Sequence, residues 1–275
     1  MKKLNFKKKI KVLDVNKLYN YKLNNKYINL IDVQYNPNEA FKKITNKSNI
    51  FIKKSFDLAF KILKKKKIYK FINGPISKKK FLDKKFVGMT EYISKHFSKK
   101  QTCMLIYNEK LSVCPVTTHL PLKFVSNTIN KKLIVNKANL INNFYKKIIG
   151  YKPKIAILGL NPHCESADVF NEDDRIIRPA VNFLKKRKIN VSGPFSADTI
   201  FLKQNRKKYN VVLGMYHDQV LTPLKTLYEY DAFNLTIGLP FLRISPDHGP
   251  NEKFLGKNKS SPVSLIKAIS FLDKN

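Results

Sequence analysis

Short apolar runs alternate with helical patterns along most of the chain. Five runs rich in aliphatic and β-branched residues predict strands, at 68–72, 103–107, 111–117, 155–160 and 211–215. Helical spacing of apolar residues separates several of these runs. Strands that alternate with helices are typical of βαβ units, so we predict an α/β fold around a largely parallel sheet.

The helix boundaries are marked by local signals. Apolar residues share one face over 55–64 and again over 136–149, where Gly150 provides the usual stop. Ser261-Pro262 predicts the start of a last helix, with a serine cap and a proline at the first position. The first fifty residues alternate only weakly, at 10–13 and 27–33, and predict one or two strands with loops.

Composition narrows the class of protein. The chain has 275 residues, of which 43% are hydrophobic, enough for a sizeable core. It contains no apolar run of about 18 residues and no signal-peptide pattern at Met1. The three cysteines lack the paired spacing of a thiolate zinc site. We therefore expect a cytoplasmic globular protein without membrane association.

The net charge of +35 suggests a polyanion-binding surface, but the type of basic residue argues otherwise. Only five of the 54 basic residues are arginine, whereas nucleic-acid readers favour arginine for bidentate contacts. The chain also contains 28 asparagines, and the lysines are scattered along its length. We attribute the charge to compositional drift and expect no specific nucleic-acid partner, with a functional polyanion surface as the alternative.

Three of the five histidines follow predicted strands. His119 comes after 111–117, His163 after 155–160 and His217 after 211–215. Ligands of open α/β sheets bind at the carboxyl ends of the strands, so these side chains are candidates for one site. Three imidazoles suit a divalent metal that keeps positions open for a substrate. His96 lies on a helical pattern and is expected to be structural.

Further candidate residues accompany the histidines. Asp198 and Asp218 are candidate proton acceptors or metal-site partners, although a helix cap and a turn are their ordinary structural roles. Lys225, Asn234 and Arg243 form a second group suited to a phosphate and a carboxylate, with a solvated surface as the alternative. No G-x-G-x-x-G or Walker A motif occurs, which disfavours a Rossmann or P-loop nucleotide site.

Several motifs together resemble one enzyme family. The sequence is similar to 4-hydroxythreonine-4-phosphate dehydrogenases, in order and spacing, from about residue 49 to the C-terminus. The resemblance rests on the segments 116–122, 159–163, 193–201, 215–219 and 234–243, and on Asp247-His248-Gly249.

The resemblance implies an architecture. It is that of the isocitrate and isopropylmalate dehydrogenases, with two α/β domains and a homodimer whose active site is shared across the interface. Residues 1–87 together with 245–275 are expected to form the NAD-side domain. Residues 88–244 are expected to form the metal, substrate and dimerisation domain.

The resemblance also implies a reaction. The C3 hydroxyl of 4-phosphooxy-L-threonine is oxidised with NAD or NADP, and loss of carbon dioxide gives 3-amino-2-oxopropyl phosphate, in pyridoxal 5′-phosphate biosynthesis. A divalent metal is required, with zinc expected and magnesium or cobalt as alternatives. The site residues that the resemblance implies are the metal ligands His119, His163 and His217; the substrate contacts Thr90, Lys225, Asn234 and Arg243; and the cofactor contacts Asp247, His248 and Gly249.

Within that scheme Asp198, Asp218 and Lys225 are the expected catalytic residues. The three histidines are expected to act across the dimer interface. One arrangement of the shared site takes His119 and His163 from one chain and His217 from the other.

The sequence departs from the family pattern in three places. Met89 replaces a substrate-contacting histidine, Ser77 replaces another imidazole, and the opening strand with its cofactor-facing loop is not found before residue 1. We expect a shortened, divergent member of the family, with a misplaced start of the sequence as the alternative. Two alternative functions also remain, and Met89 favours the first of them. One is a paralogue that oxidises another phosphorylated hydroxy acid, such as a 4-phosphothreonate or phosphoerythronate. The other is a non-catalytic basic binding protein on the same fold.

Overall fold

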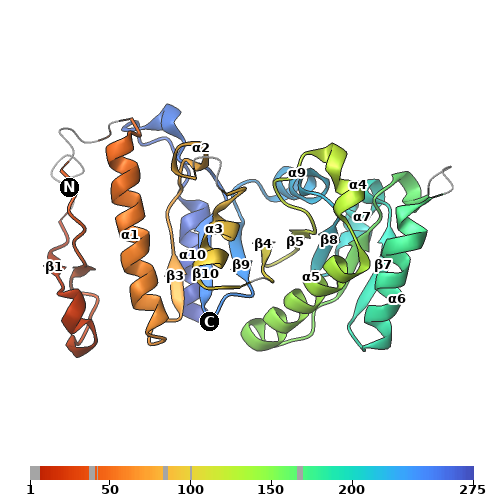
Figure 1. The fold of residues 1–275 in the computed structure, drawn as a ribbon, viewed down its shortest axis with the longest axis horizontal. Helices are drawn as coiled ribbons and strands as arrows, with labels where there is room; N and C mark the ends of the chain where they lie inside the picture. The colour runs from red at the N-terminus through yellow and green to blue at the C-terminus, as the bar shows by residue number, and fades with distance from the viewer. Residues whose placement is uncertain (1–6, 37–40, 42, 83–85, 100, 166–169) are drawn as a thin grey trace. The chain divides into compact units, whose positions relative to one another are not determined.

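The computed structural model describes residues 7–36, 41, 43–82, 86–99, 101–165 and 170–275 (Figure 1). The chain divides into two compact units, Met1–Lys61 and Ile62–Asn275. In the first unit, β1 (Ile10–Val12) pairs in parallel with β2 (Ile28–Leu30), which confirms the strands predicted there. Helix α1 (Asn46–Lys64) is longer than the predicted 55–64 and begins in this unit.

The second unit is built on one eight-stranded sheet. Four neighbouring strand pairs are parallel and three are antiparallel, so the predicted α/β class with a largely parallel sheet is confirmed. The strands are, in spatial order, β3 (Lys70–Ile72), β10 (Leu242–Pro246), β9 (Phe233–Ile237), β4 (Cys103–Tyr107), β5 (Ser112–Pro115), β8 (Val211–Gly214), β6 (Ile155–Leu158) and β7 (Val191–Phe195).

The helices of this unit agree with the predicted positions within a few residues. The predicted helix 136–149 is α5 (Lys131–Phe144) followed by a π-helical turn that ends at Gly150, where φ is +94°. The last helix, α10 (Val263–Lys274), begins two residues after Ser261. The others are α2 (Lys78–Phe81), α3 (Met89–His96), α4 (Val125–Thr128), α6 (Arg178–Lys186), α7 (Ala197–Ile200), α8 (Lys203–Arg206) and α9 (His217–Tyr228).

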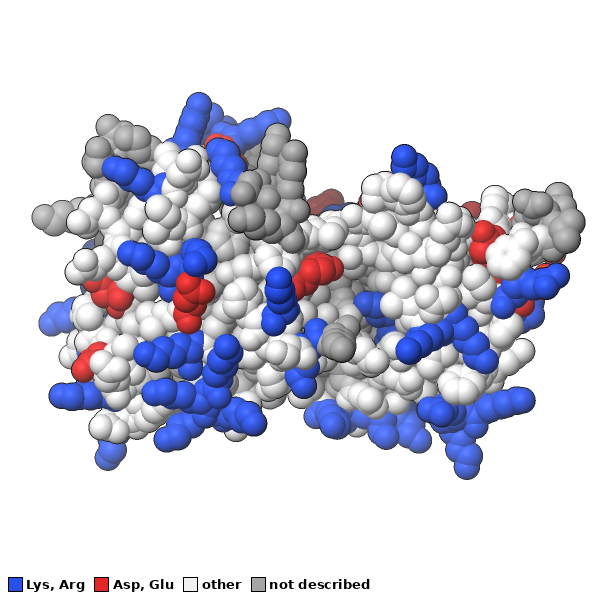
Figure 2. All heavy atoms as spheres, viewed as in Figure 1, with Lys and Arg blue, Asp and Glu red and all other residues white. Residues whose placement is uncertain are grey.

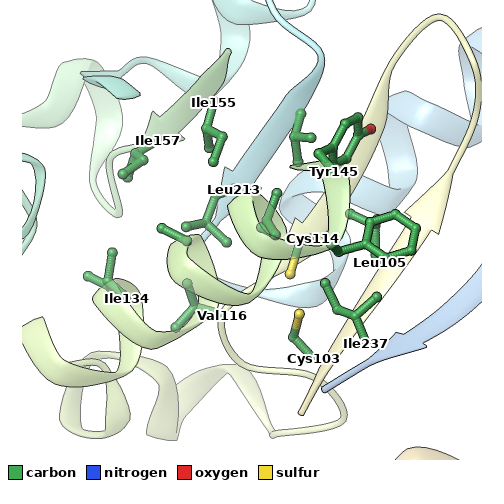
Figure 3. Packing of buried hydrophobic residues seen from close by; sticks show 14 of the residues in the cluster. Cys103, Leu105, Cys114, Val116, Ile134, Tyr145, Ile155, Ile157, Leu213 and Ile237 are labelled. Carbon is green, nitrogen blue, oxygen red and sulfur yellow. The ribbon is translucent and has the colours of Figure 1, made fainter. Parts of the chain in front are cut away.

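Alternation along the strands creates two cores. On β6, Ile155 and Ile157 belong to the core formed with α5 and α6, which is drawn in Figure 3. Ala156 and Leu158 belong to the opposite core, which contains residues of α7 and α9. Because successive side chains of a strand point to opposite faces, a strand buried on both faces is apolar throughout. This explains the uninterrupted apolar runs in the sequence.

The parallel pairing determines where the site lies. Strands β5, β8, β6 and β7 all run in the same direction, so the segments that follow them leave the sheet at one edge.

The sheet continues across the predicted domain boundary, which falls inside β10. The division into 1–87 with 245–275 and 88–244 therefore stays a prediction. Among the described residues, no helix combines the length and the apolar character needed to cross a bilayer.

Candidate functional site

A cavity of about 670 Å³ lies at this edge of the sheet. Its lining combines two of the predicted metal ligands with every predicted substrate and cofactor residue. These residues are His119, His217, Thr90, Lys225, Asn234, Arg243, Asp247, His248 and Gly249. Met89 and Ser77, the two departures from the family pattern, also line it. Residues that are far apart in the sequence thus converge on one concave surface.

Two of the three histidines form a pair within one chain. The ring centroids of His119 and His217 are 5.7 Å apart. His119 follows β5, and His217 is the first residue of α9, directly after β8. Nδ1 of His217 lies 2.7 Å from Oδ1 of Asp218, and this carboxylate fixes the orientation of the ring. Asp218 therefore contacts a predicted metal ligand, as the sequence suggested.

His163 is in a different position. It is exposed, lies outside the cavity lining and has a left-handed backbone with φ of +57°. Within the described ranges, no three His, Cys, Asp or Glu side chains are grouped closely enough to hold a metal ion. One chain thus brings together His119 and His217, rather than the His119 and His163 of the arrangement considered above.

Two buried polar residues hold the loop that carries His163. The carboxylate of Asp173, which is fully buried, accepts hydrogen bonds from the backbone N–H groups of Leu160 at 2.9 Å and Asn161 at 3.1 Å. Gln219 donates through Nε2 to the carbonyl of Gly159 at 2.8 Å, and its Oε1 accepts from the backbone of the β8 end. Side-chain bonds therefore join the ends of β6 and β8, a role that the sequence did not predict for either residue.

Arg243 lies at the base of the cavity and is 1% exposed. Its Nε donates to Oδ1 of Asn73 at 2.8 Å, and its Nη1 donates to the hydroxyl of Thr236 at 3.0 Å. Thr236 in turn lies 3.3 Å from the hydroxyl of Thr90. Burial lowers the pKa of Arg243 to about 10, and the negative charge of Glu91 opposes that shift. Arg243 remains a cation at neutral pH, ready for an anionic group.

A second cation is held by the loop that follows β10. Nζ of Lys225 lies 2.8 Å from the carbonyl oxygen of Asp247 and 2.5 Å from its carboxylate. This ion pair connects a predicted catalytic residue with a predicted cofactor residue. On the neighbouring β9, Oδ1 of Asn234 is buried and accepts no hydrogen bond from the residues that the structure describes. A ligand N–H or O–H group would satisfy it.

A smaller cavity of about 380 Å³ adjoins the first and shares His248, Gly249 and Asn251 with it. It adds two exposed aromatic rings, the ammonium group of Lys259 and two hydroxyl groups. These belong to Tyr230, Phe254, Ser260 and Ser261. Aromatic faces suit a nucleotide base, and a lysine with hydroxyl groups suits a phosphate. The family resemblance marks the loop 247–257 in this region, whereas Tyr230, Lys259 and Ser260 belong to no recognised motif.

Asp198 and His96 lie outside the cavity lining, as His163 and Asp218 do. Asp198 is exposed in the first turn of α7 and does not line either cavity. His96 ends α3, where Nδ1 lies 2.8 Å from the carbonyl of Tyr92, so its expected structural role is confirmed. Lysine and arginine side chains are spread across the face shown in Figure 2, in keeping with a compositional origin of the charge.

Comparison with known proteins identifies close relatives. The family model described as "Pyridoxal phosphate biosynthetic protein PdxA" matches residues 2–272. The 4-hydroxythreonine-4-phosphate dehydrogenase of Sulfurihydrogenibium sp. (strain YO3AOP1) is 39% identical over 246 residues, which cover 88% of this chain and 74% of the relative. The D-threonate 4-phosphate dehydrogenase of Pectobacterium atrosepticum is 31% identical over 252 residues, covering 88% of this chain and 76% of that protein.

The fold also matches a solved structure. A putative 4-hydroxythreonine-4-phosphate dehydrogenase from Salmonella typhimurium superposes with a TM-score of 0.80 at 27% identity, covering 95% of this chain and 81% of that one. Two further relatives that carry the 4-hydroxythreonine-4-phosphate dehydrogenase name match over only 55% and 65% of their own length. Some relatives are thus considerably longer than the segment they share with this chain.

Proposed function

Because the chain belongs to the pyridoxal phosphate biosynthetic protein PdxA family, we propose that it is an oxidoreductase that oxidises 4-hydroxythreonine 4-phosphate with a nicotinamide cofactor. The observation that carries the proposal is the composition of one cavity. The His119–His217 pair, the buried cation Arg243 and the tethered cation Lys225 all line it. A non-catalytic binding protein would have no need to combine these groups.

The polar groups of the cavity are matched to the substrate. Arg243 and Lys225 supply positive charge for the phosphate and the carboxylate, and their fixed hydrogen bonds limit the positions that these anions can take. The unsatisfied Oδ1 of Asn234 accepts a substrate N–H or O–H group. Thr90, buried beside Thr236, provides one further hydroxyl contact.

A dehydrogenase of this family requires a nicotinamide cofactor, and the adjoining cavity fits one. His248 and Gly249 lie where the two cavities meet. We assign the nicotinamide end to that junction, and the adenosine end to the aromatic and hydroxyl groups around Lys259. When bound, the cofactor would supply the hydride acceptor for oxidation of the hydroxyl group at substrate C3, and the β-keto acid so formed would lose carbon dioxide.

The donor set fits a divalent metal in part. His119 and His217 present two imidazoles to the cavity, and Asp218 orients one of them, as carboxylates commonly do beside metal-binding histidines. We assign the third position to His163 of the partner subunit, which makes a homodimer the functional unit. When bound, such a metal, with zinc expected, would lower the pKa of the substrate hydroxyl. The cytoplasmic location remains a prediction.

The direct test is a spectrophotometric assay of the purified chain with 4-hydroxythreonine 4-phosphate. NAD and NADP should be compared, each after chelation and again after zinc, cobalt or magnesium is restored. We expect the nicotinamide to be reduced only when metal is added and only by a dimeric protein. Light scattering would establish whether the protein is a dimer. Absence of cofactor reduction under all of these conditions, in a folded dimer, would contradict the proposal.

Met89 permits a sharper test of substrate identity. Its thioether is buried, lines the cavity and offers no hydrogen bond comparable to that of an imidazole. Met89→His should therefore raise turnover of 4-hydroxythreonine 4-phosphate roughly three- to tenfold, the worth of about one hydrogen bond. Met89→Leu, which conserves volume, should leave turnover nearly unchanged. The measurement is kcat/KM for this substrate and for D-threonate 4-phosphate.

The opposite result would have a specific meaning. If Met89→His lowers turnover of 4-hydroxythreonine 4-phosphate while the unmodified protein turns over D-threonate 4-phosphate faster, the methionine is adapted to the latter. That outcome would support the paralogue hypothesis, and the similarity to the Pectobacterium enzyme would then be the relevant one.

A further inference from the structure

Gly88 brings together two side chains that no motif connects. It precedes α3 with an extended backbone, φ −161°, which any residue can adopt. A Cβ atom at this position would lie 2.8 Å from Oε2 of Glu91 and 2.9 Å from both Nδ1 and Cε1 of His119. The carboxylate of Glu91 and the Nδ1 edge of the His119 ring therefore both lie beside the same face of Gly88, the face that would carry a Cβ atom.

The two oxygens of Glu91 differ in their surroundings. Oε1 accepts a hydrogen bond from the hydroxyl of Thr118 at 3.3 Å. Oε2 is buried and accepts no hydrogen bond within the described part of the chain. A buried carboxylate oxygen is costly to leave without a donor. Oε2 is also the Glu91 oxygen that lies nearest to the Cβ position of Gly88, and Nδ1 of His119 lies close to the same position.

Glu91 also lies close enough to Arg243 to influence its ionisation. Burial lowers the pKa of Arg243, and the negative charge of Glu91 acts in the opposite direction. Glu91 is thus a carboxylate near both the buried cation Arg243 and one imidazole of the His119–His217 pair. A negative charge at this position stabilises a proton on the ring nitrogen that faces it.

We propose that Glu91 is a positioning residue for His119. Oε2 accepts the Nδ1–H group, so that the neutral imidazole carries its proton on Nδ1 and presents Nε2 to a ligand. The hydrogen bond requires a rotation about the side-chain torsions of Glu91 or His119, and we expect it in the metal-free protein as well. The proposal rests on the function assigned to this cavity, because only a ligand-binding imidazole requires a fixed tautomer.

The first measurement uses the metal-free protein. The nitrogen that carries the proton of His119 is identified from ¹⁵N chemical shifts at a pH where the ring is neutral. We expect Nδ1–H in the unmodified chain and in Glu91→Gln, whose amide oxygen can still accept. In Glu91→Leu we expect a shift towards Nε2–H, the form favoured by imidazole without a partner. The control is Glu109→Gln, because Glu109 is an exposed carboxylate in the turn between β4 and β5.

The second measurement is zinc affinity, determined by competition with a chelating dye. Glu91→Leu should weaken binding about 10- to 100-fold, the usual effect of removing a carboxylate beside a metal-binding histidine. Glu91→Gln should weaken it less, and Glu109→Gln not at all. Gly88→Ala should resemble the leucine variant, because the new Cβ separates Oε2 from Nδ1 without straining the backbone.

The two measurements separate this proposal from the function on which it rests. If the unmodified protein binds no zinc, the metal hypothesis fails, but the tautomer of His119 still tests the role of Glu91. An Nε2–H tautomer in the unmodified chain would overturn the positioning role, and this arm requires no variant to fold. An unchanged tautomer in a folded Glu91→Leu protein would overturn it equally.

Discussion

Mixing His119→Ala protein with His163→Ala protein should restore about a quarter of the wild-type activity, whereas each protein alone should be inactive. The reason is the placement of the histidines. His119 and His217 form a pair in one chain, and His163 lies outside the cavity of that chain. If His163 of the partner subunit completes each site, a mixed dimer contains one site that lacks both groups and one intact site.

The expected recovery follows from counting sites. Random exchange makes half of the dimers mixed, and each mixed dimer carries one intact site out of two, so about a quarter of all sites are restored. Mixing His119→Ala with His217→Ala is the matched control. Both residues belong to the same chain, so no combination of these subunits yields an intact site, and we expect no recovery.

Subunit exchange should be verified with differently tagged chains before activity is measured. Recovery in the control mixture would show that His119 and His217 serve different chains in the functional dimer, contrary to their proximity here. Activity that survives His119→Ala alone would remove the metal hypothesis.

Arg243→Lys should lower kcat/KM for the phosphorylated substrate by roughly 30-fold to several thousandfold, corresponding to about 2–5 kcal/mol for disrupting a buried, hydrogen-bonded charge. Lysine keeps the charge but cannot reproduce the two directed bonds to Asn73 and Thr236. The buried acceptors then lose their donors, so the melting temperature should also fall. Steady-state kinetics and thermal unfolding measure the two effects.

Arg178→Lys is the control, because Arg178 forms an exposed i,i+4 ion pair with Asp174. Exposed pairs of this kind contribute at most about 1 kcal/mol, so neither kinetics nor melting temperature should change appreciably. If Arg243→Lys retains activity within threefold of wild type, Arg243 is a structural residue and another cation binds the substrate.

The sequence by itself determined the class of fold and most of the residues of the site. Uninterrupted apolar runs and helical spacing are local properties, so the strands at 103–107 and 211–215 and the helix ending at Gly150 could be predicted from short windows. The three histidines that follow strands also predicted the position of the site, because the carboxyl ends of parallel strands lie at the same edge of a sheet. Lys225, Asn234 and Arg243 were candidates from their chemistry, and the family motifs added Thr90; all four line the cavity.

Only the tertiary structure decided which of these residues meet. Three strand-end histidines are equivalent in the sequence, yet the structure places His119 and His217 in one cavity and leaves His163, on a loop bonded to Asp173, outside it. The contacts made by Asn73, Glu91 and Gln219 could not be predicted from the chain, since each side chain bonds to a residue at least 27 positions away. Contacts between distant segments depend on how strands pair and helices pack, and no local window of sequence contains that information.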